Sequence, residues 1–161
     1  MTSALDLTLP RLGGGEIALS DFAGKAVLVV NVASACGLTP QYRDLEALWQ
    51  AKKGAGLIVL GVPCNDFGAQ EPGDDAEIKG FCESNYSVSF PLAGKVEILN
   101  RDRRHPFYKW IAAQIGEEAL PRWNFHKYLI GKDGALEGAF SSQTPPLGVD
   151  IVGAVEKTLS A

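Results

Sequence analysis

The stretch 27-VLVVNVASACGLTPQYRDLEALW-49 decides the fold, because it joins an apolar run to an amphipathic run through a short polar loop. Residues 26–32 are nearly all apolar and rich in β-branched side chains, which indicates a strand covered on both faces of an α/β sheet. Apolar residues between positions 42 and 49 then recur at helical spacing, and residues 57–62 form a second apolar run. These segments predict a right-handed βαβ unit.

Further elements are predicted on both sides of this unit. Thr39 is expected to cap the first helix and Pro40 to lie in its first turn. The other predicted elements are two hairpins and three helices: strands 4–9 and 16–19 around 12-LGGGE-16, a helix from a cap at Asp74 or Asp75 through Asn85, a helix at 104–116, strands 124–130 and 135–140, and a helix at 148–159. This order predicts one thioredoxin-like α/β domain over residues 1–161, with an N-terminal β-hairpin and a central mixed sheet flanked by helices.

Composition excludes several classes of protein. The 161 residues are 46% hydrophobic and carry a net charge of −4, which fits one globular domain and disfavours nucleic-acid binding. No apolar run is long enough for a membrane span, and the first residues lack the pattern of a secretory signal. Three cysteines form no disulfide framework, so we expect a reducing, cytoplasmic setting.

Cys36 is the candidate reactive residue. It follows a buried strand, where open α/β sheets place their sites, and precedes a predicted helix N-terminus, which favours an anion such as a thiolate. Gly37 removes side-chain bulk beside the sulfur. Position alone leaves a buried structural thiol equally open, since cysteines are commonly buried. The motif lacks the second cysteine of C-x-x-C, which disfavours a general dithiol reductase.

Three sequence blocks resemble those of the glutathione peroxidase family: 31-NVASACGLTPQY-42, 62-VPCNDFGAQEPG-73 and 123-WNFHKYLIGKDG-134. They occur in family order, and the similarity extends through most of the chain. The resemblance implies a thioredoxin-like fold and a peroxidase that reduces hydrogen peroxide and organic or lipid hydroperoxides. It implies no cofactor or metal.

The resemblance also implies a catalytic set made of Cys36, Gln70, Trp123 and Asn124. A thiolate that attacks a peroxide oxygen becomes a sulfenic acid, and amide or indole N–H groups can stabilise the thiolate and the leaving oxygen. Taken singly, Gln70 could be a polar loop residue, Trp123 a core aromatic residue and Asn124 a turn residue.

Cys82 matches the position of the resolving cysteine in family members that use thioredoxin. Its place on the apolar face of a predicted helix also fits a packed thiol. Because a disulfide needs Cα atoms within about 7 Å, we expect the helix around 76–86 to unwind locally when Cys36 is oxidised. Cys64 is interpreted as a structural thiol.

The segment between the helix at 104–116 and Trp123 is short, which resembles the monomeric, open-site branch of the family. The blocks have no clustered arginines to hold glutathione carboxylates, so thioredoxin is favoured over glutathione. A peroxide sensor that passes oxidation to a partner, a glutathione-dependent peroxidase and a non-catalytic binding domain remain alternatives. His105 and His126 lack metal-ligand spacing and are interpreted as surface residues.

Overall fold

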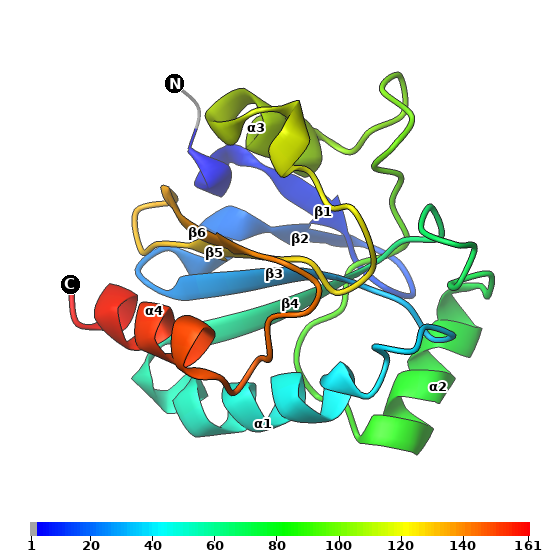
Figure 1. Ribbon diagram of the computed structural model, residues 1–161, viewed down its shortest axis with the longest axis horizontal. Coiled ribbons are helices and arrows are strands. Elements are labelled where there is room, and N and C mark those ends of the chain that lie inside the picture. Colours follow the sequence, from blue (N-terminus) through cyan, green and yellow to red (C-terminus); the bar gives the residue numbers. More distant parts are fainter. Residues whose placement is uncertain (1–2) are drawn as a thin grey trace.

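The computed structural model describes residues 3–161 and has a four-stranded sheet at its centre (Figure 1). The strands follow the order β4-β3-β5-β6: Leu57–Pro63, Ala26–Val32, Lys127–Ile130 and Leu136–Phe140. β3 pairs in parallel with β4 and antiparallel with β5, and β5 pairs antiparallel with β6. This mixed sheet, with its βαβ unit and later hairpin, confirms the predicted thioredoxin-like fold.

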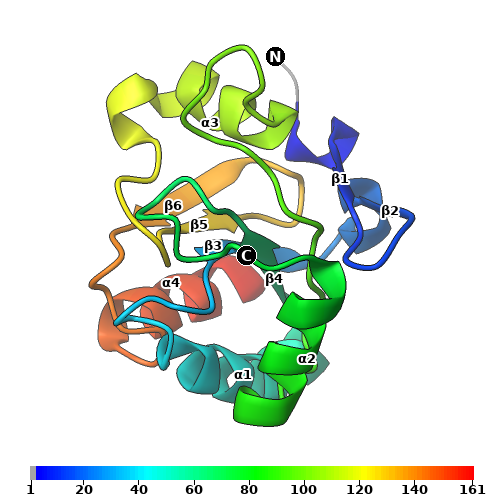
Figure 2. The same ribbon diagram turned by 90° about the vertical axis from the view of Figure 1, so that its right-hand side faces the viewer.

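Helices and a hairpin cover both faces of the sheet. The helices are α1 (Gln41–Lys52), α2 (Asp75–Tyr86), α3 (Pro106–Ile115) and α4 (Val149–Leu159), and the hairpin strands are β1 (Thr8–Pro10) and β2 (Glu16–Ala18). Short 3-10 turns occur at η1 (Ala4–Asp6), η2 (Leu19–Phe22), η3 (Lys53–Ala55) and η4 (Glu117–Ala119). α1 and α4 lie on one side of the sheet, whereas α3 and the hairpin lie on the other, and the turned view places α2 beside α1 (Figures 1 and 2).

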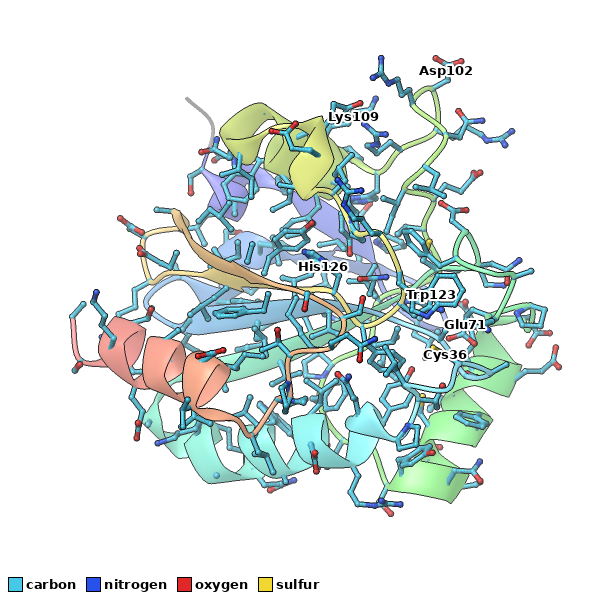
Figure 3. All side chains as sticks on the ribbon, in the orientation of Figure 1. Cys36, Glu71, Asp102, Lys109, Trp123 and His126 are labelled. Carbon is cyan, nitrogen blue, oxygen red and sulfur yellow. The ribbon has the colours of Figure 1, made fainter. Side chains whose placement is uncertain are left out.

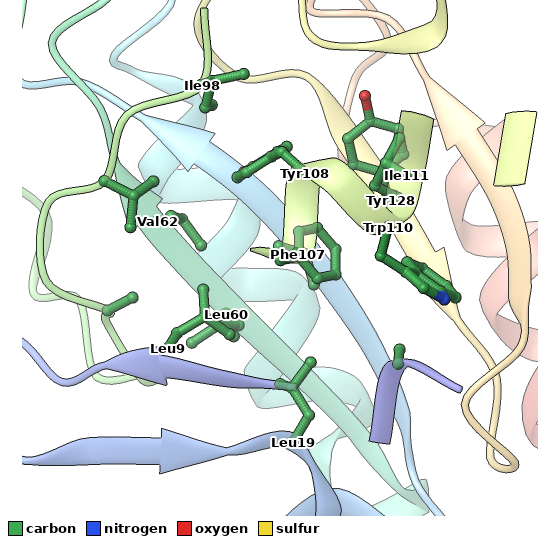
Figure 4. Close-up of a cluster of buried hydrophobic side chains, with 14 of the residues drawn as sticks. Leu9, Leu19, Leu60, Val62, Ile98, Phe107, Tyr108, Trp110, Ile111 and Tyr128 are labelled. Atoms are coloured by element: carbon green, nitrogen blue, oxygen red, sulfur yellow. The ribbon is translucent and has the colours of Figure 1, made fainter. Parts of the chain in front are cut away.

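The two faces of the sheet form two cores, as expected for a strand buried on both sides. Alternate residues of β3 divide between them: Val27 and Val29 face the hairpin and α3, whereas Leu28 and Val30 face α1, α2 and α4. Figure 4 shows part of the first core, in which side chains of α3 pack against the sheet and the hairpin. Within residues 3–161, no helix combines the length and apolar character needed to cross a membrane.

The N-terminal strands are shorter than predicted. The prediction of a strand at 4–9 is wrong for its first half, because Ser3 and Asp6 form a capping box around the turn η1. The strand predicted at 16–19 ends one residue early, where η2 begins. The remaining residues pair in the predicted hairpin around a run of glycines with positive φ.

Two other boundaries differ for identifiable reasons. The strand predicted from residue 124 begins at Lys127, because Phe125 has φ 66° and lies in a turn. The helix predicted from residue 104 begins at Pro106, because the His105 side chain accepts a hydrogen bond from the Phe107 N–H and caps it. In both places the strand or helix begins later than predicted, next to buried polar side chains.

Helix α2 is anchored at its start by side-chain hydrogen bonds to its first turn and to the N-terminal hairpin. Asp74 caps it in a reciprocal capping box with Glu77, and the Asp75 carboxylate accepts a hydrogen bond from Gly13 N–H at 2.9 Å. Its fully buried side chains are Ile78 and Cys82 alone. The second half of α2 is held by Cys82 in the core and by the partly buried rings of Phe81 and Tyr86, which pack against the same core.

We predict that Asp74→Ala lowers the free energy of unfolding by about 1 kcal/mol, because the N-cap hydrogen bond to Glu77 N–H is lost. Urea denaturation measures this change. Glu83→Ala, on the exposed face of the same helix, is the matched control and should change stability by less than about 0.5 kcal/mol. Equal effects of the two substitutions would contradict the capping assignment.

Candidate active site

Cys36 lies in the loop that follows β3, at the carboxyl edge of the sheet. The residue is only 8% exposed and belongs to the core that contains α1 and α2, although its neighbours Ala35 and Gly37 are exposed. The thiol is therefore covered, although the residues directly before and after it in the chain are exposed to solvent. The sulfur therefore lies just beneath the surface.

A tight turn delivers a backbone donor to the sulfur. The Leu38 N–H points at Cys36 Sγ across 3.3 Å. Thr39 fixes this turn, since its hydroxyl accepts a hydrogen bond from Cys36 N–H at 2.9 Å and donates one to the Ala33 carbonyl at 2.8 Å. The prediction that Thr39 caps α1 is wrong, because the helix begins at Gln41 with no side-chain cap. Thr39 instead shapes the loop around the thiol.

Gln70 is tied to the Cys36 loop through its backbone. The Gln70 carbonyl accepts a hydrogen bond from Ala35 N–H at 3.0 Å. Its side-chain oxygen accepts a hydrogen bond from Asn124 Nδ2 at 2.9 Å, which leaves the Gln70 amide nitrogen as the end available to a substrate. Asn124 is fully buried and also donates to the Phe67 carbonyl at 3.2 Å.

Trp123 lies over the loop that carries Gln70, and Figure 3 shows it close to Cys36 and Glu71 in that view. A Cβ atom on Gly68 would lie 2.7 Å from Trp123 Cη2, so only glycine leaves room for the ring. Asn31, a polar residue within β3, donates a hydrogen bond to the Trp123 carbonyl at 3.0 Å. Trp123 remains 37% exposed, which opposes the alternative of a core aromatic residue.

The structure thus links the predicted residues through a chain of contacts from three separate segments. One detail departs from the expectation: the two N–H groups of Asn124 go to Phe67 and Gln70, so Asn124 orients Gln70 and does not donate to the sulfur. The donor that does reach the sulfur, Leu38 N–H, was not predicted. The predicted helix N-terminus after Cys36 indicated backbone donors near the sulfur, but not which N–H group reaches it.

The other two cysteines are buried thiols. All three cysteines are free, and Cys64 and Cys82 have no exposed surface. Burial raises the pKa of the Cys82 thiol to about 11 and that of Cys64 to about 12. Both thiols are therefore protonated in this conformation, and Cys82 needs a change of surroundings or a base before it can react.

Sequence reasoning missed two buried charges near these loops. Glu71 is 1% exposed, and its Oε1 accepts a hydrogen bond from Ser34 N–H at 3.2 Å. Lys127 is fully buried, and its Nζ contacts the carbonyls of Ser141, Ser142 and Thr144 at 3.4, 3.2 and 2.8 Å. Burial lowers the pKa of Lys127 to about 7, but three acceptors match the three donors of an ammonium, so we assign the charged form.

The prediction that both histidines lie on the surface is wrong. His105 is half-buried as the cap of α3. His126 is half-buried with its ring 4.9 Å from that of Tyr128, and its Nε2 is buried without a hydrogen-bond partner in the described chain. Among residues 3–161, no group of three or more His, Cys, Asp or Glu side chains could hold a metal ion.

Known proteins resemble this chain in both sequence and fold. The glutathione peroxidase family model matches residues 5–112. The chain is 42% identical over 157 residues to the glutathione peroxidase-like peroxiredoxin GPX5 of Chlamydomonas reinhardtii, covering 96% of this chain and 95% of that protein. It is 46% identical over 155 residues to the hydroperoxy fatty acid reductase Gpx2 of Synechocystis sp. strain PCC 6803, covering 96% and 98%. The crystal structure of Trgpx in apo form superposes with a TM-score of 0.75 at 39% identity, covering 96% of each chain.

We predict that His126 stays neutral down to about pH 5. Burial, together with the charges of Lys127 and Arg122, lowers its pKa from 6.5 to about 4. Because the unfolded chain binds this proton more readily, stability is full above about pH 6.5 and falls as the pH drops toward 4. NMR titration of the imidazole and urea denaturation across this range measure both effects. In His126→Gln the fall should be smaller, and an imidazole that titrates near 6.5 would refute the assignment.

Proposed function

The chain belongs to the glutathione peroxidase family and is a thiol-dependent peroxidase, and on this premise we propose that Cys36 attacks the peroxide and Cys82 resolves the product. Thioredoxin then reduces the Cys36–Cys82 disulfide. The observation that carries the proposal is the turn that directs Leu38 N–H at Cys36 Sγ and ties the same loop to Gln70. An N–H donor at this distance can hydrogen-bond to the sulfur that attacks the peroxide.

In the first step the Cys36 thiolate attacks one peroxide oxygen and the O–O bond breaks. The sulfur becomes a sulfenic acid, and the other oxygen leaves as an alcohol or water after it takes a proton. Gln70 Nε2 and the Trp123 indole N–H are the neutral donors proposed for this developing charge. Asn124 serves as a positioning residue, since its hydrogen bond fixes which end of the Gln70 amide is free.

In the second step the Cys82 sulfur attacks the Cys36 sulfenic acid, which releases water and forms a disulfide. Both cysteines pack in the same core, yet Cys82 is held inward by α2 and its thiol has a pKa of about 11. We therefore propose that α2 opens locally. Opening should begin in its second half, since the first turn is anchored by the capping box and by Gly13.

The proposed substrates are hydrogen peroxide and organic or lipid hydroperoxides. One relative is named a hydroperoxy fatty acid reductase, and the exposed Trp123 side chain offers an apolar surface beside the site. The short connection from α3 through η4 to Trp123 favours a monomer whose site stays open to a protein reductant. A cytoplasmic location and thioredoxin as the electron donor complete the proposal.

We predict that the wild type turns over hydrogen peroxide and a fatty-acid hydroperoxide when thioredoxin, its reductase and NADPH are supplied. Turnover with glutathione should be at least about tenfold slower. Cys36→Ser should abolish turnover by removing the nucleophile, and Cys82→Ser should abolish thioredoxin-supported turnover while mass spectrometry finds Cys36 as a sulfenic or more oxidised acid. Cys64→Ser is the matched control and should retain turnover.

Oxidation of Cys36 without turnover would favour a sensor that passes oxidation to a partner. Thiol reactivity unchanged by Cys36→Ser would instead favour a binding domain without catalysis. Faster turnover with glutathione than with thioredoxin would reject the proposed reductant while leaving the peroxidase step intact.

We predict that amide hydrogen exchange across residues 76–86 speeds up when Cys36 and Cys82 are joined, with the larger increase over residues 81–86. The reason is that a disulfide cannot form while α2 holds Cys82 inward. Mass spectrometry of reduced and peroxide-treated protein measures the change. Cys82→Ser treated with peroxide controls for oxidation itself, and equal protection in both redox states would count against opening.

A further inference from the structure

Glu71 is a buried carboxyl group that the two steps above do not use. It is 1% exposed and lies between Gln70 and the segment that leads into α2. Its backbone N–H donates to Asn65 Oδ1 at 2.9 Å, and its Oε1 accepts from Ser34 N–H at 3.2 Å. Its second oxygen, Oε2, is buried and has no hydrogen-bond partner in the described chain. A buried carboxyl oxygen without a partner is costly, which calls for a functional explanation.

Residues 70 and 71 are tied to the Cys36 loop by two hydrogen bonds, of which one reaches the Glu71 carboxyl. That one is the bond from Ser34 N–H, and the other is the bond between Ala35 N–H and the Gln70 carbonyl. Movement of α2 therefore leaves Glu71 bound to the loop that carries Cys36, to which Cys82 must come to form the disulfide. Figure 3 shows the labelled Glu71 and Cys36 close together in that view.

Other titratable groups face this carboxyl from each neighbouring element. Cys82 comes from α2, Tyr42 from α1 and Lys95 from the segment between α2 and α3, and each interacts electrostatically with Glu71. Burial raises the pKa of Glu71 above its ordinary value, which the Ser34 hydrogen bond and Lys95 oppose. A carboxylate with a raised pKa is a better proton acceptor near neutral pH than an exposed one.

We propose that Glu71 is the acid–base residue of the resolving step, acting on Cys82 and on the sulfenic oxygen of Cys36. The Glu71 carboxylate takes the proton from the Cys82 thiol. The resulting thiolate attacks the Cys36 sulfur, the S–O bond breaks, and the departing hydroxide takes the proton back from Glu71 and leaves as water. Sulfenic acid and thiol thus become disulfide and water, and Glu71 ends as the carboxylate with which it began.

This inference rests on the proposed function and adds a residue to it. A merely structural role for Glu71 would require only an acceptor for Ser34 N–H. Glutamine supplies the same acceptor with nearly the same shape but cannot exchange a proton. Glu71→Gln therefore separates a proton-transfer role from a structural one, and Glu137→Gln, at an exposed carboxylate of β6, is the matched control.

The test is a single turnover with one equivalent of hydrogen peroxide, quenched over time and analysed by mass spectrometry with a sulfenic-acid trap. In Glu71→Gln we expect Cys36 oxidation within about twofold of the wild-type rate. Disulfide formation should slow by roughly a hundredfold at pH 7, the lower range of general acid–base contributions. Glu137→Gln should match the wild type in both steps.

The pH dependence of disulfide formation in the wild type gives a second readout, which does not depend on whether the variant folds. With Glu71 as the base, the wild-type rate should level off once the pH exceeds the pKa of Glu71, which burial raises above its ordinary value. Without a base, the rate should keep rising about tenfold per pH unit as the thiol ionises. In Glu71→Gln the plateau should be replaced by this continuing rise.

Three results would overturn the inference. These are an unchanged rate of disulfide formation in Glu71→Gln, an equal slowing of both steps, and a wild-type rate that keeps rising into the alkaline range. Failure of the proposed function looks different, because the wild type would then form no Cys36 sulfenic acid or no Cys36–Cys82 disulfide at all.

Discussion

The site depends on the hydrogen bonds that join residues 34–35 to residues 70–71. Ser34 and Ala35 donate their backbone N–H groups to the Glu71 side chain and the Gln70 carbonyl, respectively. Two loops that leave neighbouring parallel strands are thereby fixed against each other at the carboxyl edge of the sheet. Without these bonds, Cys36 and Gln70 would lie on loops that move independently. The Leu38 N–H and the Gln70 amide would then hold no fixed position relative to each other around a substrate.

Much of the fold could be predicted from the sequence because the central strands are buried on both faces. Continuous apolar runs predict β3 and β4, and helical spacing predicts α1, so the βαβ unit follows directly. The boundaries at Thr39 and Phe125 could not be predicted, because buried polar groups override local propensity there. Thr39 is drawn to Cys36 N–H and the Ala33 carbonyl, and the turn at Phe125 is held by Asn31.

For the candidate site as well, the sequence indicates which side chains take part, whereas the folded backbone determines how they are held. The sequence blocks predict that the site contains Cys36, Gln70, Trp123 and Asn124, and the structure links their segments. The direction of the Asn124 hydrogen bonds and the Leu38 donor emerge only from the folded backbone. The burial of Glu71 was also missed, although a charged residue next to the predicted site residue Gln70 is a signal that could have indicated it.

Helix α2 must satisfy two opposing requirements if it carries the resolving cysteine. In the reduced state it must keep Cys82 protonated and covered, which burial achieves by raising the pKa of that thiol to about 11. After oxidation it must release the same residue toward Cys36. Burial of Cys82 meets the first requirement, and we propose that the second is met when the other half of α2 opens while the anchored first turn stays in place. The position of Glu71 ahead of that anchored turn then keeps the proposed proton acceptor bound to the Cys36 loop, through Ser34 N–H, during this opening.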